Sequence, residues 1–411
     1  MNNYSNHKEF TRRKFIKTAG LGIAAMTLTA NSNSSQNNSL KPKKKVRIGI
    51  IGGSFGLSFQ FHEHPDCIVE AVSDLRPERR SALMKTYKCS KSYDSLETLI
   101  RDPKIDAVFI ATGAPDHAKH VIASLKAGKH VLCAVPAAMT LEDCDDILNT
   151  VKKTGLTYMM AETSVWRQSM ISVKKLYVDG AFGNLMSYAA QYNHPGLETL
   201  YIEKGKKTWR YGLPPMLYPT HCTSFVVGLT KERLTEVTCL GWGDNDPILK
   251  DNQFNNPFWN ESAFFRTSKR LPFHIEVNWK GALRGTERGE WRGDKMSLFM
   301  SHGSMSSPVL VKAGEKTVKD EGGFNVTENV VEEFIAPQWW KTEMLPESLR
   351  YDSGHEGSHT FITHEFIDSI VRERTPEVDI YQAIAMTAPG IVAHQSALKG
   401  GELLKIPSFD I

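Results

Sequence analysis

KKKVRIGIIGGSFG, residues 43–56, is the stretch that decides the fold. Its apolar run, Val46–Ile51, carries one charge and breaks into glycines, which predicts a buried strand that turns into a helix. Glycines let the backbone turn tightly and approach phosphate oxygens, and a helix N-terminus offers free N–H groups. The stretch therefore predicts the start of a dinucleotide-binding fold. The residues expected to hold the pyrophosphate are Gly52, Gly53, Ser54, Phe55 and Gly56.

The glycine spacing departs from Gly-x-Gly-x-x-Gly, because Ser54 and Leu57 stand where glycines are usual. A second apolar run, residues 68–73, supports the prediction, since it ends in Asp74, about 20 residues further on, where an acid bonds the ribose hydroxyls. A carboxylate there favours NAD over NADP because it repels a 2′-phosphate, although Arg76 is close enough to weaken that preference. The alternative is an ordinary strand and glycine turn.

Length allows two domains, and composition indicates a soluble globular protein. The chain has 411 residues, of which 41% are hydrophobic and 23% charged. A net charge of +4 is too small and too scattered to indicate a nucleic-acid partner. The six cysteines show no CxxC or Cys/His metal spacing, and the sequence does not pair them as disulfides.

The first 40 residues differ in kind from the rest. Residues 11–17, TRRKFIK, have the twin-arginine form and precede an apolar run, residues 19–30, that is too short to anchor the chain in a bilayer. We expect a twin-arginine signal peptide over residues 1–30 and a disordered spacer over 31–43, hence export to the periplasm. The alternative is an amphipathic leader of a cytoplasmic protein.

This export route carries folded proteins, so a nicotinamide nucleotide loaded before export would be retained outside the cytoplasm. We therefore expect a tightly bound, recycled NAD, with NADP the less favoured cofactor, and the twin-arginine export machinery as a partner.

The segment after Asp74 alternates helices and strands. Helical patterns at residues 76–87 and 117–127 alternate with apolar strands at 106–111 and 130–134, which predicts a doubly wound parallel sheet. In such sheets the ligand crevice lies at the carboxyl ends of the strands. The further cofactor-binding residues expected at that edge are Thr112, Pro115, His117, Ala134 and Pro136.

The order VRIGIIGG (46–53), AVSD (71–74) and DAVFIATGAPDHAKHVIASLKAGKHVLCAVPAAMT (106–140) resembles the Gfo/Idh/MocA oxidoreductases, and the tail at 357–407 fits as well. The resemblance implies an N-terminal Rossmann domain over residues 44–165 and a C-terminal α/β domain over 166–411 with an open, mostly antiparallel sheet. It further implies late helices near 359–398 that pack back toward the first domain, and a homo-oligomer.

Two departures from that family bear on the chemistry. The strand at 130–134 is usually followed by Glu-Lys-Pro, whose lysine lies near nicotinamide and substrate, but this chain has Val135 before Pro136. Valine cannot transfer a proton, so the lysine-assisted oxidation is not carried over, and Lys129 is a poor substitute. Leu217 likewise stands where dehydrogenase members place an aspartate one helical turn before His221.

Val135-Pro136, YPTH at 218–221 and SGHEG at 353–357 resemble one branch of the family, the NAD-dependent glycoside hydrolases of the α-N-acetylgalactosaminidase type. That resemblance implies transient oxidation of a sugar C3 hydroxyl, which acidifies the C2 proton and permits elimination of the aglycone. A carbohydrate or glycoside is then the substrate.

Such chemistry needs two bases and one acid, and imidazole, phenol and carboxylate groups can serve when their pKa values are tuned. For each candidate the alternative is a hydrogen-bonded core or loop residue. A less favoured alternative is a metal held by Glu162, His194 and His221, a workable ligand set if the fold brings them together. The catalytic candidates are His221, Tyr218, Glu162, Tyr192 and His194.

Aromatic and arginine side chains could line a sugar site, by stacking on the ring and bonding hydroxyls. Residues 284–293, in which acids alternate with bases, are expected to form a hairpin loop. The function hypotheses are a glycosidase with transient C3 oxidation, a net glycoside 3-dehydrogenase, a lyase, and a non-catalytic nucleotide- or sugar-binding protein. The sugar-site candidates are Arg167, Trp209, Arg210 and Tyr211.

Overall fold

The structure is a computed structural model that describes residues 45–194, 197–283, 285–302 and 306–409. The expected signal peptide and spacer lie outside these residues. Across the described segments, no helix combines the length and the apolarity that a membrane span requires. All six cysteines lie in the described part of the chain and are buried free thiols.

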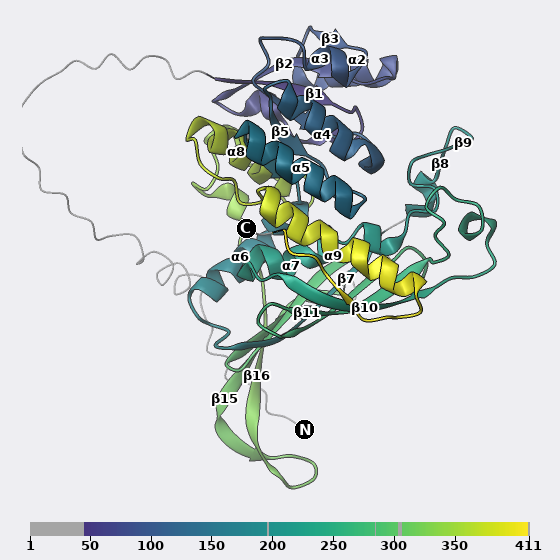
Figure 1. Ribbon diagram of the computed structural model, residues 1–411. Helices are drawn as coiled ribbons and strands as arrows, with labels where there is room; N and C mark the ends of the chain where they lie inside the picture. Colours follow the sequence, from purple (N-terminus) through teal and green to yellow (C-terminus); the bar gives the residue numbers. More distant parts are fainter. Residues whose placement is uncertain (1–44, 195–196, 284, 303–305, 410–411) are drawn as a thin grey trace, which may run out of the picture. The chain divides into compact units, whose positions relative to one another are not determined.

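The first sheet has six parallel strands in the order β3-β2-β1-β4-β5-β6, which confirms the predicted doubly wound parallel sheet (Figure 1). Its central strands are buried on both faces because helices cover both sides. The strands are β1 (Val46–Ile51), β2 (Cys67–Ser73), β3 (Ser92–Tyr93), β4 (Ala107–Ile110), β5 (His130–Cys133) and β6 (Tyr158–Met160). The helices are α2 (Pro77–Tyr87), α3 (Leu96–Leu99), α4 (His117–Lys126) and α5 (Leu141–Thr154).

The expectation of a helix directly after the glycine stretch is wrong. The chain instead forms two short 3-10 helices, η1 (Phe55–Ser58) and η2 (Phe61–Glu63). Phe59 and Phe61 are fully buried, and the Phe59 ring centre lies 4.6 Å from that of Phe109 on β4. Gln60 between them adopts a left-handed φ of 49°. Burial of successive aromatic rings therefore outweighs continuation of a helix.

The second sheet has nine strands in the order β16-β15-β14-β13-β7-β12-β11-β10-β17. All neighbours pair antiparallel except β7 and β12, which confirms the expected open, mostly antiparallel sheet. The strands are β7 (Leu185–Asn193), β10 (Leu234–Trp242), β11 (Asn260–Thr267), β12 (Pro272–Asn278), β13 (Thr286–Gly293), β14 (Met296–Phe299), β15 (Val309–Lys319), β16 (Asn325–Glu333) and β17 (Leu404–Lys405).

The hairpin loop expected at residues 284–293 is wrong, because β13 occupies most of that segment and pairs with β7 and β14. Trp291 is fully buried and its indole N–H donates to the carbonyl of Phe225 at 2.9 Å. Glu290 forms ion pairs with Arg288 and Arg292. A charged strand is stable here because its acids and bases pair with one another.

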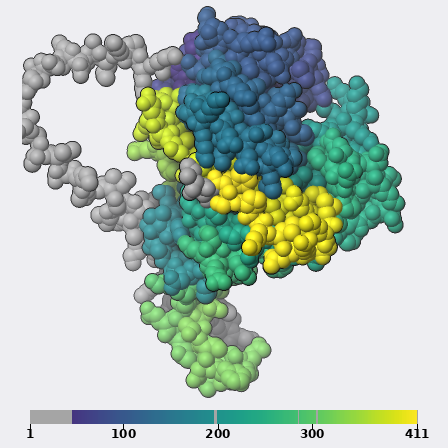
Figure 2. Space-filling view, in the orientation of Figure 1, coloured from purple at the N-terminus to yellow at the C-terminus, as the bar shows by residue number. Residues whose placement is uncertain are grey.

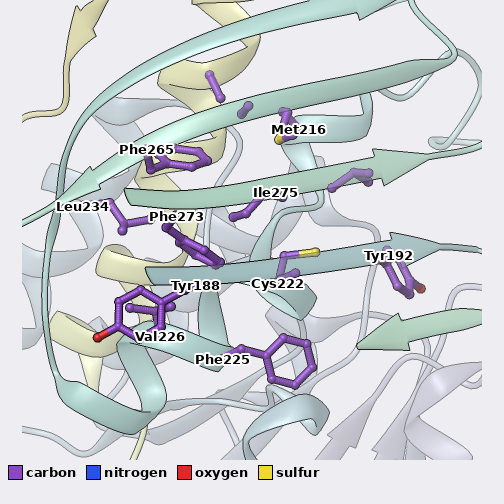
Figure 3. Packing of buried hydrophobic residues seen from close by; sticks show 14 of the residues in the cluster. Tyr188, Tyr192, Met216, Cys222, Phe225, Val226, Leu234, Phe265, Phe273 and Ile275 are labelled. Carbon is purple, nitrogen blue, oxygen red and sulfur yellow. The ribbon is translucent and has the colours of Figure 1, made fainter. Parts of the chain in front are cut away.

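One face of the second sheet is covered by α7 (Thr220–Thr230) and α9 (Ile380–Leu398). Figure 3 shows Phe225 of α7 with Phe265 and Phe273 of the sheet in one apolar cluster. Every residue of α7 except the last, Thr230, is buried, so the position of this helix is set by packing.

The late helices contact the first domain. In α8 (Ser358–Val371), Phe366 and Ile367 belong to the apolar cluster of β1 and β4. The α9 helix contacts α5 and β6 as well as β10. In Figure 2 the yellow atoms of the C-terminal region lie directly against the blue atoms of the first domain. These contacts bring residues that follow the first sheet's strands close to α7.

Candidate active site

The glycine turn and Asp74 are held together at the carboxyl end of β1 and β2. Gly52 has a φ of 103°, and a Cβ there would lie 2.3 Å from the carbonyl oxygen of Ala111, so a side chain cannot be accommodated. The N–H of Gly53 donates to Oδ2 of Asp74 at 2.7 Å. A glycine turn fixed beside a carboxylate at this edge fits a dinucleotide.

His117 joins the two loops that follow β4 and β5. It is buried, with Nδ1 2.7 Å from the carbonyl of Pro136 and Nε2 3.2 Å from the carbonyl of Thr112. Burial lowers the pKa of His117, whereas its hydrogen bonds to the two carbonyls oppose that shift. The neutral ring can donate its one N–H to only one of these carbonyls at a time. Pro115 and Ala134 lie at the same edge of the sheet, as predicted from the strand ends.

Neither Val135 nor Lys129 supplies an amine to this edge. Val135 is buried in the apolar cluster of α4, α5 and α9. Lys129 precedes β5 and so lies at the opposite edge, where its Nζ donates to the carbonyls of Asp102 and Ile105 at 2.9 and 2.7 Å.

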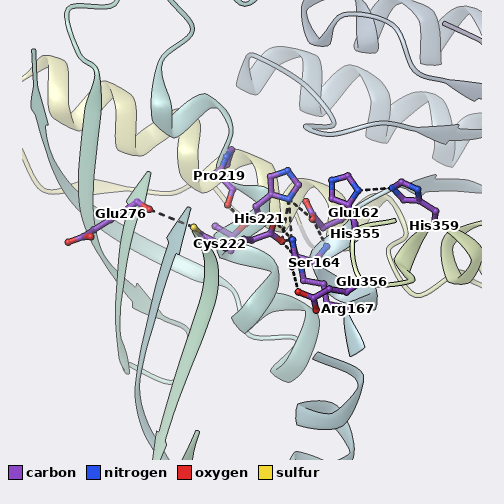
Figure 4. A network of polar contacts seen from close by, with 12 residues as sticks. Glu162, Ser164, Arg167, Pro219, His221, Cys222, Glu276, His355, Glu356 and His359 are labelled. Atoms are coloured by element: carbon purple, nitrogen blue, oxygen red, sulfur yellow. Dashed lines mark hydrogen bonds and ion pairs between the residues drawn. The ribbon is translucent and has the colours of Figure 1, made fainter. Parts of the chain in front are cut away.

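Glu162 and His221, 59 residues apart, form a buried pair. Glu162 follows β6, is fully buried, and caps η4 (Thr163–Trp166) by accepting the N–H of Ser164 at 2.9 Å. His221 stands in the first turn of α7, with Nδ1 2.9 Å from Oε1 of Glu162 and 3.1 Å from Oγ of Ser164. Figure 4 shows the carboxylate and hydroxyl beside the imidazole.

The pKa directions agree with a charged pair. Burial would raise the pKa of Glu162, but the charge of His221 and its hydrogen bond outweigh burial and lower that pKa to about 2. Burial would lower the pKa of His221, but the charges of Glu162 and Glu287 raise it above the ordinary 6.5. The two carboxylates therefore favour the protonated form of His221.

Glu287 of β13 is a site residue that the sequence prediction missed. Ser164 Oγ donates to its Oε1 at 2.5 Å, and Arg167 donates to both carboxylate oxygens, from Nε at 2.8 Å and Nη2 at 2.7 Å. Because the hydroxyl hydrogen of Ser164 is donated to Glu287, the Oγ atom of Ser164 accepts the Nδ1–H of His221. The one large apolar residue nearby, Trp291, hinted at a strand, but the charges around it favoured a loop.

Arg167 is engaged by two carboxylates. In addition to Glu287, its Nη1 donates to Oε1 of Glu356 at 2.6 Å. Burial would lower the pKa of Arg167, but the charges of Glu287 and Glu356 outweigh burial and raise that pKa above its ordinary value. The guanidinium of Arg167 therefore balances the charges of the carboxylates around His221. That Arg167 contacts the sugar stays a prediction.

Two tyrosines lie beside His221. The ring centre of Tyr192, at the end of β7, is 4.7 Å from that of His221, and the Tyr218 ring centre is 5.2 Å away. The two phenol rings stack 6.1 Å apart. Burial raises the pKa of both, and the charge of Arg210 limits the rise for Tyr218. In its protonated form each phenol can donate a hydrogen bond.

His194 lies next to these aromatic residues, with ring centres 5.9 Å from Tyr192 and 6.4 Å from Trp279. Among the residues with described positions, no three His, Cys, Asp or Glu side chains are grouped as metal ligands. The metal alternative of Glu162, His194 and His221 therefore gains no support from this geometry.

Two further histidines, His355 in the segment at 353–357 and His359 in the first turn of α8, lie beside the site. His355 Nδ1 lies 2.8 Å from His359 Nε2, and Figure 4 shows His355 between His359 and the His221 group. Burial lowers the pKa of both rings, that of His359 to about 4. His359 stacks on Phe59, 4.6 Å between centres, and Phe55 meets both histidines edge-on. The glycine turn thus contacts the second domain.

Of the remaining sugar-site candidates, Trp209 and Arg210 reach the site. A Cβ on Gly113, after β4, would lie 2.8 Å from Trp209, so the indole packs on that loop. Arg210 lies over the same indole, 4.2 Å from its centre, and its charge acts on Tyr218. Tyr211 packs instead on Lys207 and Tyr201.

Two protein-family descriptions match parts of the chain. Residues 46–162 match the Gfo/Idh/MocA oxidoreductase family, NAD-binding Rossmann fold. Residues 288–410 match the glycosyl hydrolase 109 C-terminal domain. The first range ends at Glu162 and the second begins one residue after Glu287.

Similar whole proteins span nearly all of this chain. A glycosyl hydrolase family 109 protein of Solibacter usitatus is 24% identical, covering 96% of this chain and 95% of its own. An alpha-N-acetylgalactosaminidase of Tannerella forsythia is 22% identical, covering 98% and 97%. The structure of a levoglucosan dehydrogenase in complex with NADH and levoglucosan has a TM-score of 0.69 at 18% identity, covering 89% and 100%, which shows a shared fold.

Proposed function

Because the chain joins a Gfo/Idh/MocA NAD-binding Rossmann domain to a glycosyl hydrolase 109 C-terminal domain, we propose that this NAD-dependent enzyme oxidises a sugar C3 hydroxyl transiently during glycoside cleavage. The observation that carries the proposal is the buried Glu162–His221 pair beside two phenols. These groups provide proton transfer at the edge where a dinucleotide fits.

The dinucleotide would be held by the glycine turn at residues 52–56, by Asp74, and by the loops after β4 and β5 that contain Thr112, Pro115, Ala134 and Pro136. When bound, NAD⁺ supplies a reversible two-electron acceptor next to the sugar. The remaining chemistry is proton transfer, for which the chain supplies the groups.

His221 is the base for the C3 hydroxyl. Its Nδ1–H is held by Glu162 and Ser164, so Nε2 is the nitrogen that takes the hydroxyl proton. It can do so only when the ring is neutral, and its raised pKa moves the appearance of the neutral form to higher pH. Oxidation then leaves a C3 carbonyl, which makes the neighbouring C2 proton acidic.

Tyr218 is the better candidate for the C2 proton, because the charge of Arg210 opposes the rise in its pKa and favours the phenolate that acts as the base. For Tyr192, the neighbouring Tyr218 and Glu287 raise the pKa more than Arg167 lowers it. Loss of the C2 proton expels the aglycone oxygen from C1, which leaves with a proton from Tyr192. Water then adds across the C1–C2 double bond, and reduction of the C3 carbonyl restores the sugar with no net redox change.

Incubation with 4-nitrophenyl glycosides, beginning with the α-N-acetylgalactosaminide, tests this function. The expected result is many nitrophenolate turnovers per bound nucleotide without accumulation of NADH. Stoichiometric NADH without nitrophenolate would instead identify a net glycoside 3-dehydrogenase. If none of the glycosides yields nitrophenolate or NADH, the remaining hypothesis is a non-catalytic nucleotide- or sugar-binding protein.

NAD rather than NADP, tight retention, a homo-oligomeric state and periplasmic location complete the proposal. Asp74 and the twin-arginine form of residues 11–17 support the cofactor and its loading before export. Denaturing the purified protein should release NAD, which chromatography identifies. Protein that yields no nucleotide would contradict retention.

A further inference from the structure

Three arginines follow Asp74 at the edge of the first sheet. Asp74 accepts the backbone N–H of Gly53 at 2.7 Å and that of Arg76 at 2.9 Å. Arg80 donates from Nη1 to the carbonyl of Asp74 at 2.7 Å. Two more guanidinium groups lie close by. Arg76 directly precedes α2, and Arg79 lies in the first turn of that helix.

This position decides between the two nicotinamide dinucleotides. A carboxylate after the second strand bonds the ribose 2′-hydroxyl of NAD, whereas a nearby arginine accommodates the 2′-phosphate of NADP. Arginine is well suited to phosphate because its planar fork donates two parallel hydrogen bonds. The chain offers both kinds of group here, so Asp74 alone does not set the preference.

A carboxylate from the second domain occupies both arginines. Glu203 accepts from Nη1 of Arg76 at 2.7 Å and from Nη2 of Arg79 at 3.0 Å. It ends β8 (Ile202–Glu203), which pairs with β9 (Lys206–Lys207) (Figure 1). The hairpin therefore presents its acid more than 120 residues away in sequence from the arginines that it neutralises.

The hairpin turn fixes where that acid lies. Glu203 pairs with Lys206, which leaves a two-residue turn, Lys204 and Gly205, with φ values of 50° and 75°. Positive φ at both central positions is the geometry that closes a tight two-residue hairpin. Glu203 is thus the last paired residue before the turn, in a defined place.

We propose that Glu203 is a specificity-determining residue that sets the preference for NAD by holding Arg76 and Arg79 away from a 2′-phosphate. Its negative charge also opposes that of the phosphate. The inference rests on the proposed NAD-dependent function and adds to it a residue outside the Rossmann domain that selects the cofactor.

A competition experiment tests the proposal. The full chain is first stripped of retained nucleotide on charcoal and then incubated with equal concentrations of NAD⁺ and NADP⁺. After gel filtration and denaturation, the released nucleotides are separated by ion-exchange chromatography. Wild type should release mainly NAD, and Glu203→Ala should shift the recovered ratio about tenfold toward NADP, because two guanidiniums become available. Glu203→Asp, which keeps the charge, should shift it less.

Two further variants make the outcome decisive. Adding Arg76→Ala and Arg79→Ala to Glu203→Ala should abolish the gain in NADP, whereas Glu142→Gln, an exposed acid on α5, should leave the ratio unchanged. An unchanged ratio in Glu203→Ala, or a gain that persists in the triple variant, would overturn the inference while leaving NAD binding intact. A wild-type chain that bound neither nucleotide would overturn the proposed function as well.

Discussion

At the scale of single residues, the site is built around the two nitrogens of His221. Nδ1 is committed to Glu162 and Ser164, and behind Ser164 stands Glu287, which is itself neutralised by Arg167. The imidazole is therefore oriented, its tautomer is defined, and its pKa is raised by carboxylates. These three effects are what a general base at Nε2 requires.

The pH profile of kcat/KM should reveal this arrangement. His221 must be neutral to act, so activity should rise with pH through an apparent pKa above 6.5. Glu162→Gln removes the counter-charge, so it should move this acid limb to lower pH by about one unit and reduce the plateau about tenfold to a hundredfold.

Glu356→Gln is the matched control for that profile. It makes the same acid-to-amide change on a residue that bonds Arg167 but not His221, so the acid limb should stay near its wild-type position. An acid limb that is identical in wild type and Glu162→Gln would show that this carboxylate does not act through His221.

Tyr218→Phe should separate oxidation from cleavage. The phenol handles the C2 proton in the proposed sequence, so a single turnover should still form NADH while aglycone release falls by about 10²–10⁴. Stopped-flow absorbance measures both. Tyr211→Phe, whose ring packs on Tyr201, should retain both steps. Equal loss of NADH formation and of release in Tyr218→Phe would contradict the assigned role.

At the scale of secondary structure, the strand ends were predictable and the segments between them were less so. Asp74, Thr112 and Glu162 could be placed from sequence because apolar β runs lead directly to them. The helix after Gly56 could not, since Phe59 and Phe61 turn the chain inward to bury their rings. At these residues tertiary packing outweighs the local sequence pattern.

Glu287 was missed for a related reason. A strand with four charged residues in eight looks like an exposed loop, and only the partners on other elements show otherwise. Arg167 and Ser164 lie more than 110 residues away in sequence. No local pattern carries that information, so the part of the hydrogen-bond network that Glu287 forms was beyond sequence-based prediction.

The turn after β1 yields a prediction about glycine. Gly52→Ala should abolish retention of the nucleotide and lower the melting temperature, because its Cβ would meet the carbonyl of Ala111 at 2.3 Å. Gly155→Ala is a suitable control: its φ of 65° is also positive, but nothing lies within 4 Å. The control should lose only about 1 kcal/mol of stability and keep its nucleotide. Equal behaviour of the two variants would contradict the assigned close approach.

At the scale of the whole molecule, buried ion pairs connect elements that are distant in sequence. Glu162 and His221 join β6 to α7, and Glu287 and Arg167 join β13 to the start of α6 (Gln168–Val178). Breaking a buried pair leaves an uncompensated charge and costs about 3–5 kcal/mol. The site's charge balance therefore also contributes to the stability of the fold.

Acid stability should follow from those carboxylates. Burial would raise the pKa of Glu287, but Arg167 and His221 lower it, and that of Glu162 falls to about 2. Groups with a lowered folded-state pKa stabilise the protein above their ordinary value of 4.5, and this stabilisation disappears as pH falls toward the folded value. The melting temperature should therefore drop steeply between about pH 4.5 and 2.

The measurement that checks this is differential scanning calorimetry of wild type and Glu162→Gln over that pH range. The variant lacks one of the titrating groups, so its melting temperature should be lower at neutral pH and fall less steeply with acid. Parallel curves for the two proteins would show that Glu162 does not titrate on unfolding.

The most direct test of the account is glycoside cleavage in D₂O. Transient oxidation at C3 makes the C2 proton exchangeable, so the sugar released from a 4-nitrophenyl glycoside should carry deuterium at C2 in the proton NMR spectrum, with no net NADH in the absorbance. Release of the sugar with its C2 proton fully retained would mean direct displacement at C1, and would contradict the proposed chemistry.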